Sequence, residues 1–213
     1  MSNEVAEELD SKAIIRQLLI STVLFLPLCF FIWFYASSLF VVPVKYLLQW
    51  IVTWWQPDLF NLVTQDHYFL KVETLIFLSQ TFQGQNDKLV ALDVTVNPML
   101  YGYGLAVISG LVVSIPEMKT SKRVMQIIFG YVLIVLIQTF GSFWELIKHL
   151  IFDAGTDAQN AILATGLNHN FAALMYQLSY LIIPAVVPVA YWIIMNNKFI
   201  SEITGLGKFG ELT

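Results

Sequence analysis

Residues Asn97–Gly104 read Asn-Pro-Met-Leu-Tyr-Gly-Tyr-Gly, and they separate a polar, alternating sequence from a long apolar one. Asn97 is a favourable N-cap, and Pro98 fits the first helical turn, where its missing N–H would have no partner anyway. The stretch therefore predicts that a helix begins here. Two tyrosines lie at the depth of lipid headgroups, and two glycines allow another backbone to approach closely. Both an ordinary helix entrance and a specific docking surface fit this pattern. The two tyrosines are Tyr101 and Tyr103, and the two glycines are Gly102 and Gly104.

The composition is that of an integral membrane protein. Hydrophobic residues make up 57% of the 213 positions and charged residues only 12%, whereas a soluble domain has about 25% charged residues. The net charge of -4 is small, and the basic residues stand beside apolar runs, so nothing indicates a nucleic-acid partner. The one cysteine, Cys29, lies in an apolar run, which excludes a disulfide framework and a cysteine-based metal motif.

Four apolar segments are long enough for helices that cross a bilayer, which needs about 20 residues. We therefore expect an α-helical integral membrane protein with four transmembrane helices, a small extracytoplasmic β-hairpin and an interfacial amphipathic helix. The predicted order is a cytoplasmic polar lead (1–17), helix 1 (18–42), the external helix and hairpin (43–97), helix 2 (98–116), a basic cytoplasmic loop (117–123), helix 3 (124–150), an external loop (151–170), helix 4 (171–195) and a cytoplasmic tail (196–213).

The predicted external module combines two periodicities. Apolar residues recur at helical spacing over 43–56, with two tryptophans at its end, which is typical of a helix lying on the membrane surface. Alternation over 68–78 and 88–96, with a turn cluster at 84–87, predicts two strands of a hairpin. A lone hairpin is marginally stable, so its apolar face needs a cover. The amphipathic helix, the membrane surface and a partner protein all remain open as that cover.

Orientation follows from the basic residues, which favour the cytoplasmic side. Seven of the eleven lie in the lead, the 117–123 loop and the tail, so both termini are expected in the cytoplasm. The seven are Lys12, Arg16, Lys119, Lys122, Arg123, Lys198 and Lys208.

The third predicted span ends in a group of charged residues, Glu145, Lys148, His149 and Asp153, spaced to share one helix face. His169 stands across the following loop. This group has three interpretations: an ion-pair cluster that anchors the helix, a docking patch, or an intramembrane hydrolase or metal site using Glu145, His149 and His169. No phosphate loop, nucleophile elbow or cofactor signature accompanies it, so no cofactor and no metal are expected.

Three stretches resemble the bacterial exosortase H-associated membrane proteins: Asn97–Gly104, Phe-Trp-Glu-Leu-Ile-Lys at 143–148, and Tyr-Gln-Leu-Ser-Tyr-Leu-Ile-Ile-Pro-Ala-Val-Val-Pro-Val-Ala at 176–190. The resemblance covers roughly residues 20–200. It implies a small inner-membrane accessory protein encoded beside an exosortase, a multi-span cysteine transpeptidase-like enzyme that processes secreted proteins with a C-terminal sorting tail.

Exosortases use cysteine, arginine and histidine at the outer face, and this chain departs from that pattern. Cys29 lies deep in the first predicted span, and the outward segments contain no arginine. We therefore expect a non-enzymatic companion that binds an exosortase or its tailed substrate, besides membrane lipids. The docking candidates are Asn97, Pro98, Tyr101, Gly102, Tyr103, Gly104, Glu145, Lys148, His149, His169, Tyr176, Gln177 and Tyr180.

Overall fold

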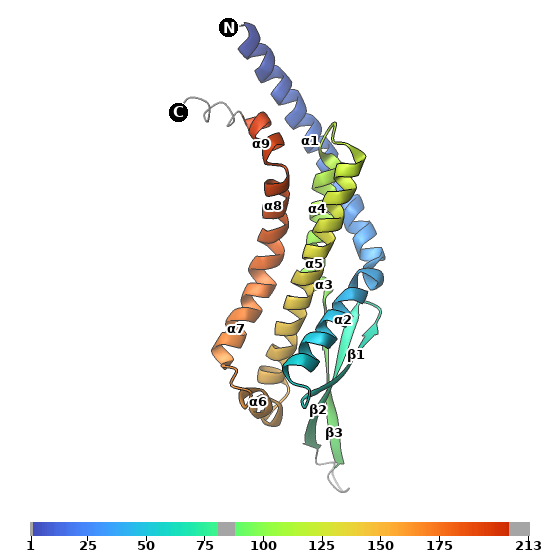
Figure 1. Ribbon diagram of the computed structural model, residues 1–213, viewed down its shortest axis with the longest axis vertical. Helices are drawn as coiled ribbons and strands as arrows, with labels where there is room; N and C mark the ends of the chain where they lie inside the picture. Colours follow the sequence, from blue (N-terminus) through green and yellow to red (C-terminus); the bar gives the residue numbers. More distant parts are fainter. Residues whose placement is uncertain (1, 81–87, 205–213) are drawn as a thin grey trace. The chain divides into compact units, whose positions relative to one another are not determined.

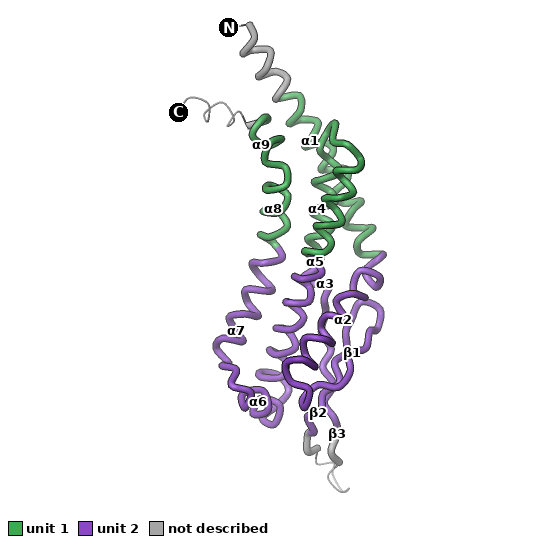
Figure 2. The backbone as a smooth tube through the Cα atoms, viewed as in Figure 1, with its two compact units in different colours: residues 1–35, 103–133, 185–213 green, residues 36–102, 134–184 purple. Residues whose placement is uncertain are grey.

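The computed structural model describes residues 2–80 and 88–204 (Figure 1). It divides into two compact units, unit 1 with residues 1–35, 103–133 and 185–213, and unit 2 with residues 36–102 and 134–184 (Figure 2). The helices are α1 (Ser2–Tyr35), α2 (Ser37–Trp55), α3 (Met99–Gly102), α4 (Gly104–Ser114), α5 (Thr120–Lys148), α6 (Thr156–Leu163), α7 (His169–Gln177), α8 (Ile183–Met195) and α9 (Asn197–Thr204). Single π-helical turns η1 (His149–Asp153) and η2 (Leu178–Ile182) and strands β1 (Phe60–Asp66), β2 (Phe69–Gln80) and β3 (Lys88–Val96) complete the order.

Three helical stretches of the described chain are long and apolar enough to cross a membrane: Lys12–Tyr35, Thr120–Asp153 and His169–Met195. The second predicted span corresponds to a shorter apolar helix, Met99–Ser114. At 1.5 Å per residue it reaches about 24 Å, less than the roughly 30 Å of a bilayer's hydrocarbon core. The first candidate span, Lys12–Tyr35, begins and ends earlier than the predicted 18–42, because α1 ends at Tyr35 and α2 begins directly after Ala36.

The β structure of unit 2 is a three-stranded antiparallel sheet in the order β1-β2-β3. Its β2 and β3 are the two predicted strands, and the predicted turn at 84–87 lies outside the described residues. The predicted pair of strands is confirmed, but the prediction missed β1, which makes the sheet three-stranded. The register of β1 shifts between Phe60 and Val63, so its buried residues do not recur at the spacing of two that identifies a strand.

Helix α2 covers one face of this sheet. Leu70, Val72 and Val96 of the sheet are fully buried, as are Val44 and Leu48 of α2, which lies against β1. Of the three covers left open, the fold uses the chain's own helix α2, which contains the 43–56 segment.

One glutamine of α2 also fixes the edge of the sheet. The Gln49 side chain donates to the carbonyl oxygen of Asn61 over 3.0 Å and accepts from the backbone N–H of Val63. These bonds pair backbone groups of β1 that face no neighbouring strand, at the place where its register is irregular. The helix therefore both buries the sheet and completes its hydrogen bonding.

The opposite face of the sheet is mixed in character. The Lys71 ammonium lies 2.8 Å from the Asp93 carboxylate, and this hydrogen bond raises the pKa of Lys71. Leu75 and Phe77 are exposed on the same side of β2. This alternation agrees with the strand predicted over 68–78.

The segment 151–170, predicted as a loop, contains the helix α6. Asp157 lies in its first turn, where a carboxylate favours the helix dipole, and Ala158 and Ile162 are fully buried. The buried pair is spaced by four residues, and α6 contacts β2. The predicted loop is therefore partly helical, and the helix was not predicted because eight residues provide too short a periodic signal.

Burial against the sheet predicts a specific cost in α2. We expect Leu48→Ala to lower the free energy of unfolding by roughly 2–5 kcal/mol, because it leaves a cavity between helix and sheet. Leu39→Ala is the matched control, since Leu39 is exposed on the same helix, and we expect it to change stability by less than about 0.5 kcal/mol. Thermal and denaturant unfolding in detergent measure both. Equal losses for the two variants would contradict the packing of α2 on the sheet.

Candidate functional site

The 97–104 stretch is anchored to α5 through one carboxylate. Asn97 caps the new helix as predicted, since its Oδ1 accepts from the backbone N–H of Met99 over 3.1 Å. The backbone N–H of Asn97 donates to both oxygens of Glu145, over 3.2 and 3.3 Å. The Tyr101 hydroxyl donates to Oε2 of Glu145 over 3.0 Å. Glu145 therefore joins the end of the sheet, the first turn of the next helix and α5.

The Glu145 carboxylate and the Tyr101 side chain are both buried, so the hydrogen bonds to this carboxylate matter for stability. Glu145 is 7% exposed and Tyr101 is fully buried. A carboxylate away from water is costly unless hydrogen bonds replace its hydration, and bonds to an ionised acceptor are about twice as strong as neutral ones. The three donated bonds supply that replacement. These bonds hold Asn97 and Tyr101 in position against α5, and each carboxylate oxygen accepts from at least one donor.

Close packing surrounds the carboxylate. A side chain on Gly141 would collide with the Tyr101 ring, and one on Gly102 would collide with the amide of Gln138. Gln138 Nε2 in turn donates to the carbonyl oxygen of Pro98 over 3.2 Å. A close approach is thus observed at Gly102 as predicted, but the neighbour is a side chain and not another backbone, and Gly141 allows a similar approach.

A second group of charges lies one helical turn beyond Glu145. The Asp153 carboxylate lies 2.6 Å from Lys148 Nζ and 2.7 Å from His149 Nδ1. His149 Nε2 is 4.0 Å from Glu145 Oε1. The π-helical turn η1 explains the first contact, because its backbone bonds join residues five apart and so bring Lys148 and Asp153 together. The predicted network of these four residues is therefore present.

Three tyrosines connect this group to the helix that follows. Tyr176 and Tyr180 stack with their ring centroids 5.8 Å apart, and Tyr180 meets the Tyr101 ring edge-on at 6.4 Å. Lys148 Nζ lies 5.8 Å from the centre of the Tyr176 ring, within cation–π range. The 176–180 segment thus contacts both the buried carboxylate group and the outer charges.

His169 does not join the cluster. It is exposed at the first residue of α7, where Asn168 caps the helix by accepting from the N–H groups of Asn170 and Phe171. Within residues 2–80 and 88–204, no group of three or more histidine, cysteine, aspartate or glutamate side chains could hold a metal ion. The hydrolase or metal interpretation of Glu145, His149 and His169 therefore receives no support from the geometry.

Two parts of the arrangement had no signal in the sequence. The donor from Asn97 is its backbone N–H, which every residue except proline has, and Glu145 lies 48 positions away. A second buried pair, Gln126 and Asn196 of unit 1, exchanges two amide hydrogen bonds of 3.0 and 3.2 Å. Long-range polar pairs of this kind become visible only when the helices are placed.

The Tyr101–Glu145 bond can be measured by a double-mutant cycle. We expect Tyr101→Phe to destabilise unit 2 by roughly 1–2 kcal/mol and Glu145→Gln by roughly 1.5–3 kcal/mol, because each leaves a buried polar group short of a partner. Since the two groups share one bond, the double variant should lose less than the sum, by about 0.5–3 kcal/mol. Tyr180→Phe is the control, because it removes the same hydroxyl group from a tyrosine that is exposed. Strict additivity in thermal and denaturant unfolding would contradict the bond.

Comparison with known proteins identifies a family that matches most of the chain. The family described as exosortase H-associated membrane protein matches residues 12–199. That range covers both units, the sheet, the 97–104 stretch and the cluster around Glu145. Neither the curated proteins nor the solved structures provided a match. Because the family match covers most of its length, the chain belongs to the exosortase H-associated membrane proteins.

Proposed function

We propose that the protein is a non-enzymatic accessory subunit of the bacterial inner membrane that binds an exosortase or its tailed substrate and so assists protein sorting. The family description names a membrane protein associated with exosortase H. The charged cluster supports a role without chemistry, because Glu145 accepts three bonds from its own chain and is buried. A general acid or base needs access to its substrate, which this carboxylate lacks.

A polar position on α7 is the observation that carries the docking proposal. Gln177 is exposed within the candidate span His169–Met195, and no hydrogen bond from its amide is found in the described chain. An amide facing lipid hydrocarbon is costly, whereas an amide facing another transmembrane helix stabilises the pair. Tyr180, one turn further, is also exposed. We therefore assign Gln177 and Tyr180 to the contact with a partner helix.

The other docking candidates divide by accessibility. Five of them are buried, and we propose that these hold the surface in shape rather than contact a partner: Pro98, Tyr101, Gly102, Gly104 and Glu145. His169 is exposed, and the remaining residues are partly exposed: Asn97, Tyr103, Lys148, His149 and Tyr176. Lys148 and His149 lie at the end of α5, and Lys148 contacts the Tyr176 ring next to Gln177, so these partly exposed residues extend the proposed surface from Gln177 to the end of α5.

We also propose four membrane crossings with both termini in the cytoplasm. The helices α1 and α9, near the two ends of the chain, contact one another within unit 1. Unit 1 also contains the basic residues of the 117–123 loop, whereas the sheet belongs to unit 2. For the short helix Met99–Ser114 to cross, the bilayer must thin locally or its flanking residues must extend the crossing.

Co-purification with an exosortase tests the docking surface. From membranes that contain both proteins, we expect Gln177→Leu to reduce the recovered partner roughly threefold, because one interhelical hydrogen bond contributes about 0.6 kcal/mol. Adding Tyr180→Phe should bring the loss to roughly tenfold. Leu181→Ala is the matched control, an exposed neighbour on the same helix that has no polar group.

The possible results distinguish an error in the proposed role from an error in the proposed contact. If the wild-type chain is recovered alone while the exosortase is present, the accessory role is wrong. If the partner is recovered equally with Gln177→Leu, the role stands but the choice of α7 is wrong. Thermal unfolding of each variant should match the wild type, since both side chains are exposed.

A further inference from the structure

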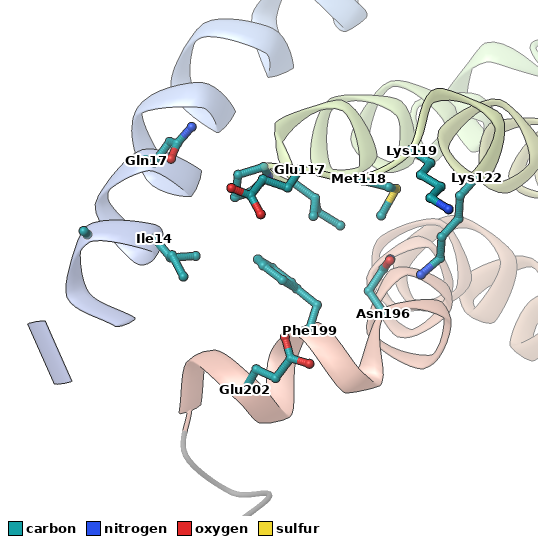
Figure 3. Close-up of a pocket in the computed structure, with 12 residues that line it drawn as sticks. Ile14, Gln17, Glu117, Met118, Lys119, Lys122, Asn196, Phe199 and Glu202 are labelled. Carbon is teal, nitrogen blue, oxygen red and sulfur yellow. The ribbon is translucent and has the colours of Figure 1, made fainter. Parts of the chain in front are cut away.

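A pocket of about 560 Å³ lies wholly within unit 1, apart from the cluster described above (Figure 3). Its walls come from the first part of α1, from the segment between α4 and α5, and from the corner where α8 meets α9. The volume is within the range of small-molecule sites, roughly 300–1,000 Å³. Its walls combine charged, amide and apolar side chains.

The two signs of charge occupy different parts of this pocket. Lys119 and Lys122 run along one side, next to Asn196 (Figure 3). Glu117 and Glu202 extend into the middle from different walls, the α4–α5 segment and α9, with the Phe199 ring near both (Figure 3). The pocket thus has a cationic side and an anionic side.

Its position in the chain places it where lipid headgroups lie. The candidate spans begin at Lys12 and Thr120 and end at Met195, and the lining residues come from 13–17, 115–122 and 196–202. These segments are the ends of the spans that we assign to the cytoplasmic side. Lysines at such ends are expected from the orientation of membrane proteins alone, but that rule does not account for two carboxylates facing the same pocket.

We propose that this pocket binds the headgroup of an aminophospholipid such as phosphatidylethanolamine. The phosphate lies at Lys119 and Lys122, and the primary ammonium lies between Glu117 and Glu202. The acyl chains leave along the apolar lining, where Ile14 and Phe199 lie. A purely anionic headgroup would meet the two carboxylates without a counter-charge, and a purely cationic peptide would meet the two lysines. Only a zwitterionic group satisfies both sides.

The backbone at Glu117 gives this side chain an unusual setting. Glu117 has φ 56°, in the left-handed region, directly after Pro116. A residue with a Cβ is strained in this region, and glycine is not. This conformation directs Glu117 into the pocket, and Glu117→Gly would remove both the strain and the carboxylate.

Native mass spectrometry of the full chain in mild detergent tests the proposal through lipids with identical acyl chains. We expect the wild type to retain phosphatidylethanolamine about fivefold more tightly than phosphatidylglycerol or phosphatidylcholine, as one additional ion pair near a surface would give. Phosphatidylglycerol lacks the ammonium, and the quaternary ammonium of phosphatidylcholine cannot donate hydrogen bonds to the carboxylates. This comparison requires no variant, so a failure to fold cannot obscure it.

Two charge variants locate the site. The double variant Lys119→Ala, Lys122→Ala should weaken the binding of all three lipids by about tenfold or more, because all three contain the phosphate. Glu117→Gln with Glu202→Gln should remove only the preference for phosphatidylethanolamine. Lys45→Ala, in unit 2, is the control and should change neither.

Three results would overturn the proposal. The first is equal or tighter retention of phosphatidylglycerol by the wild type. The second is a preference for phosphatidylethanolamine that survives the double glutamine variant. The third is displacement of the lipid by a short oligolysine peptide at a lower concentration than phosphatidylethanolamine itself requires, which would identify a peptide site instead.

Discussion

The hydrogen bonds to Glu145 are the constraint on which unit 2 depends. The strand β3 ends at Val96, and the next backbone N–H donates to a carboxylate on a helix 48 residues later. Without a buried acceptor at that point, the chain would leave the sheet with an unpaired donor inside the protein. The carboxylate therefore decides where the sheet ends and where the following helix begins.

The same bonds fix the position of Glu145 among the histidine and carboxylate residues near this helix end. A buried carboxylate that accepts from the Asn97 N–H and the Tyr101 hydroxyl is stabilised in its position, and His149 Nδ1 lies next to Asp153 instead. The π-helical turn at His149–Asp153 shifts the helix register by one residue, which places Lys148 against Asp153 as well. The charges thus compensate one another along one surface, as an anchoring or docking patch requires.

Features that depend on neighbouring residues could be predicted from the sequence, whereas contacts between residues far apart in the chain could not. The helix start at Asn97 and Pro98 follows from local chemistry, and the strands at 69–80 and 88–96 follow from their alternation, so all three could be predicted. The strand β1 was missed because its bulge breaks the period, and α6 was missed because it has only two buried residues. The partners of Glu145 could not be predicted, since one is a backbone group and the other an ordinary tyrosine far along the chain.

The two units are stabilised by different means. Unit 2 has a core of aliphatic side chains between a helix and a sheet, where burial itself favours folding. In unit 1 the long helices bury little, and no residue of the apolar window in α1 is buried. Lipid removes the hydrophobic advantage of helix association, so close approach and polar pairs must provide it. Gly110 against Leu26 and the paired amides of Gln126 and Asn196 are contacts of that kind. Most of the surface of α1 thus remains available to lipid or to a partner helix.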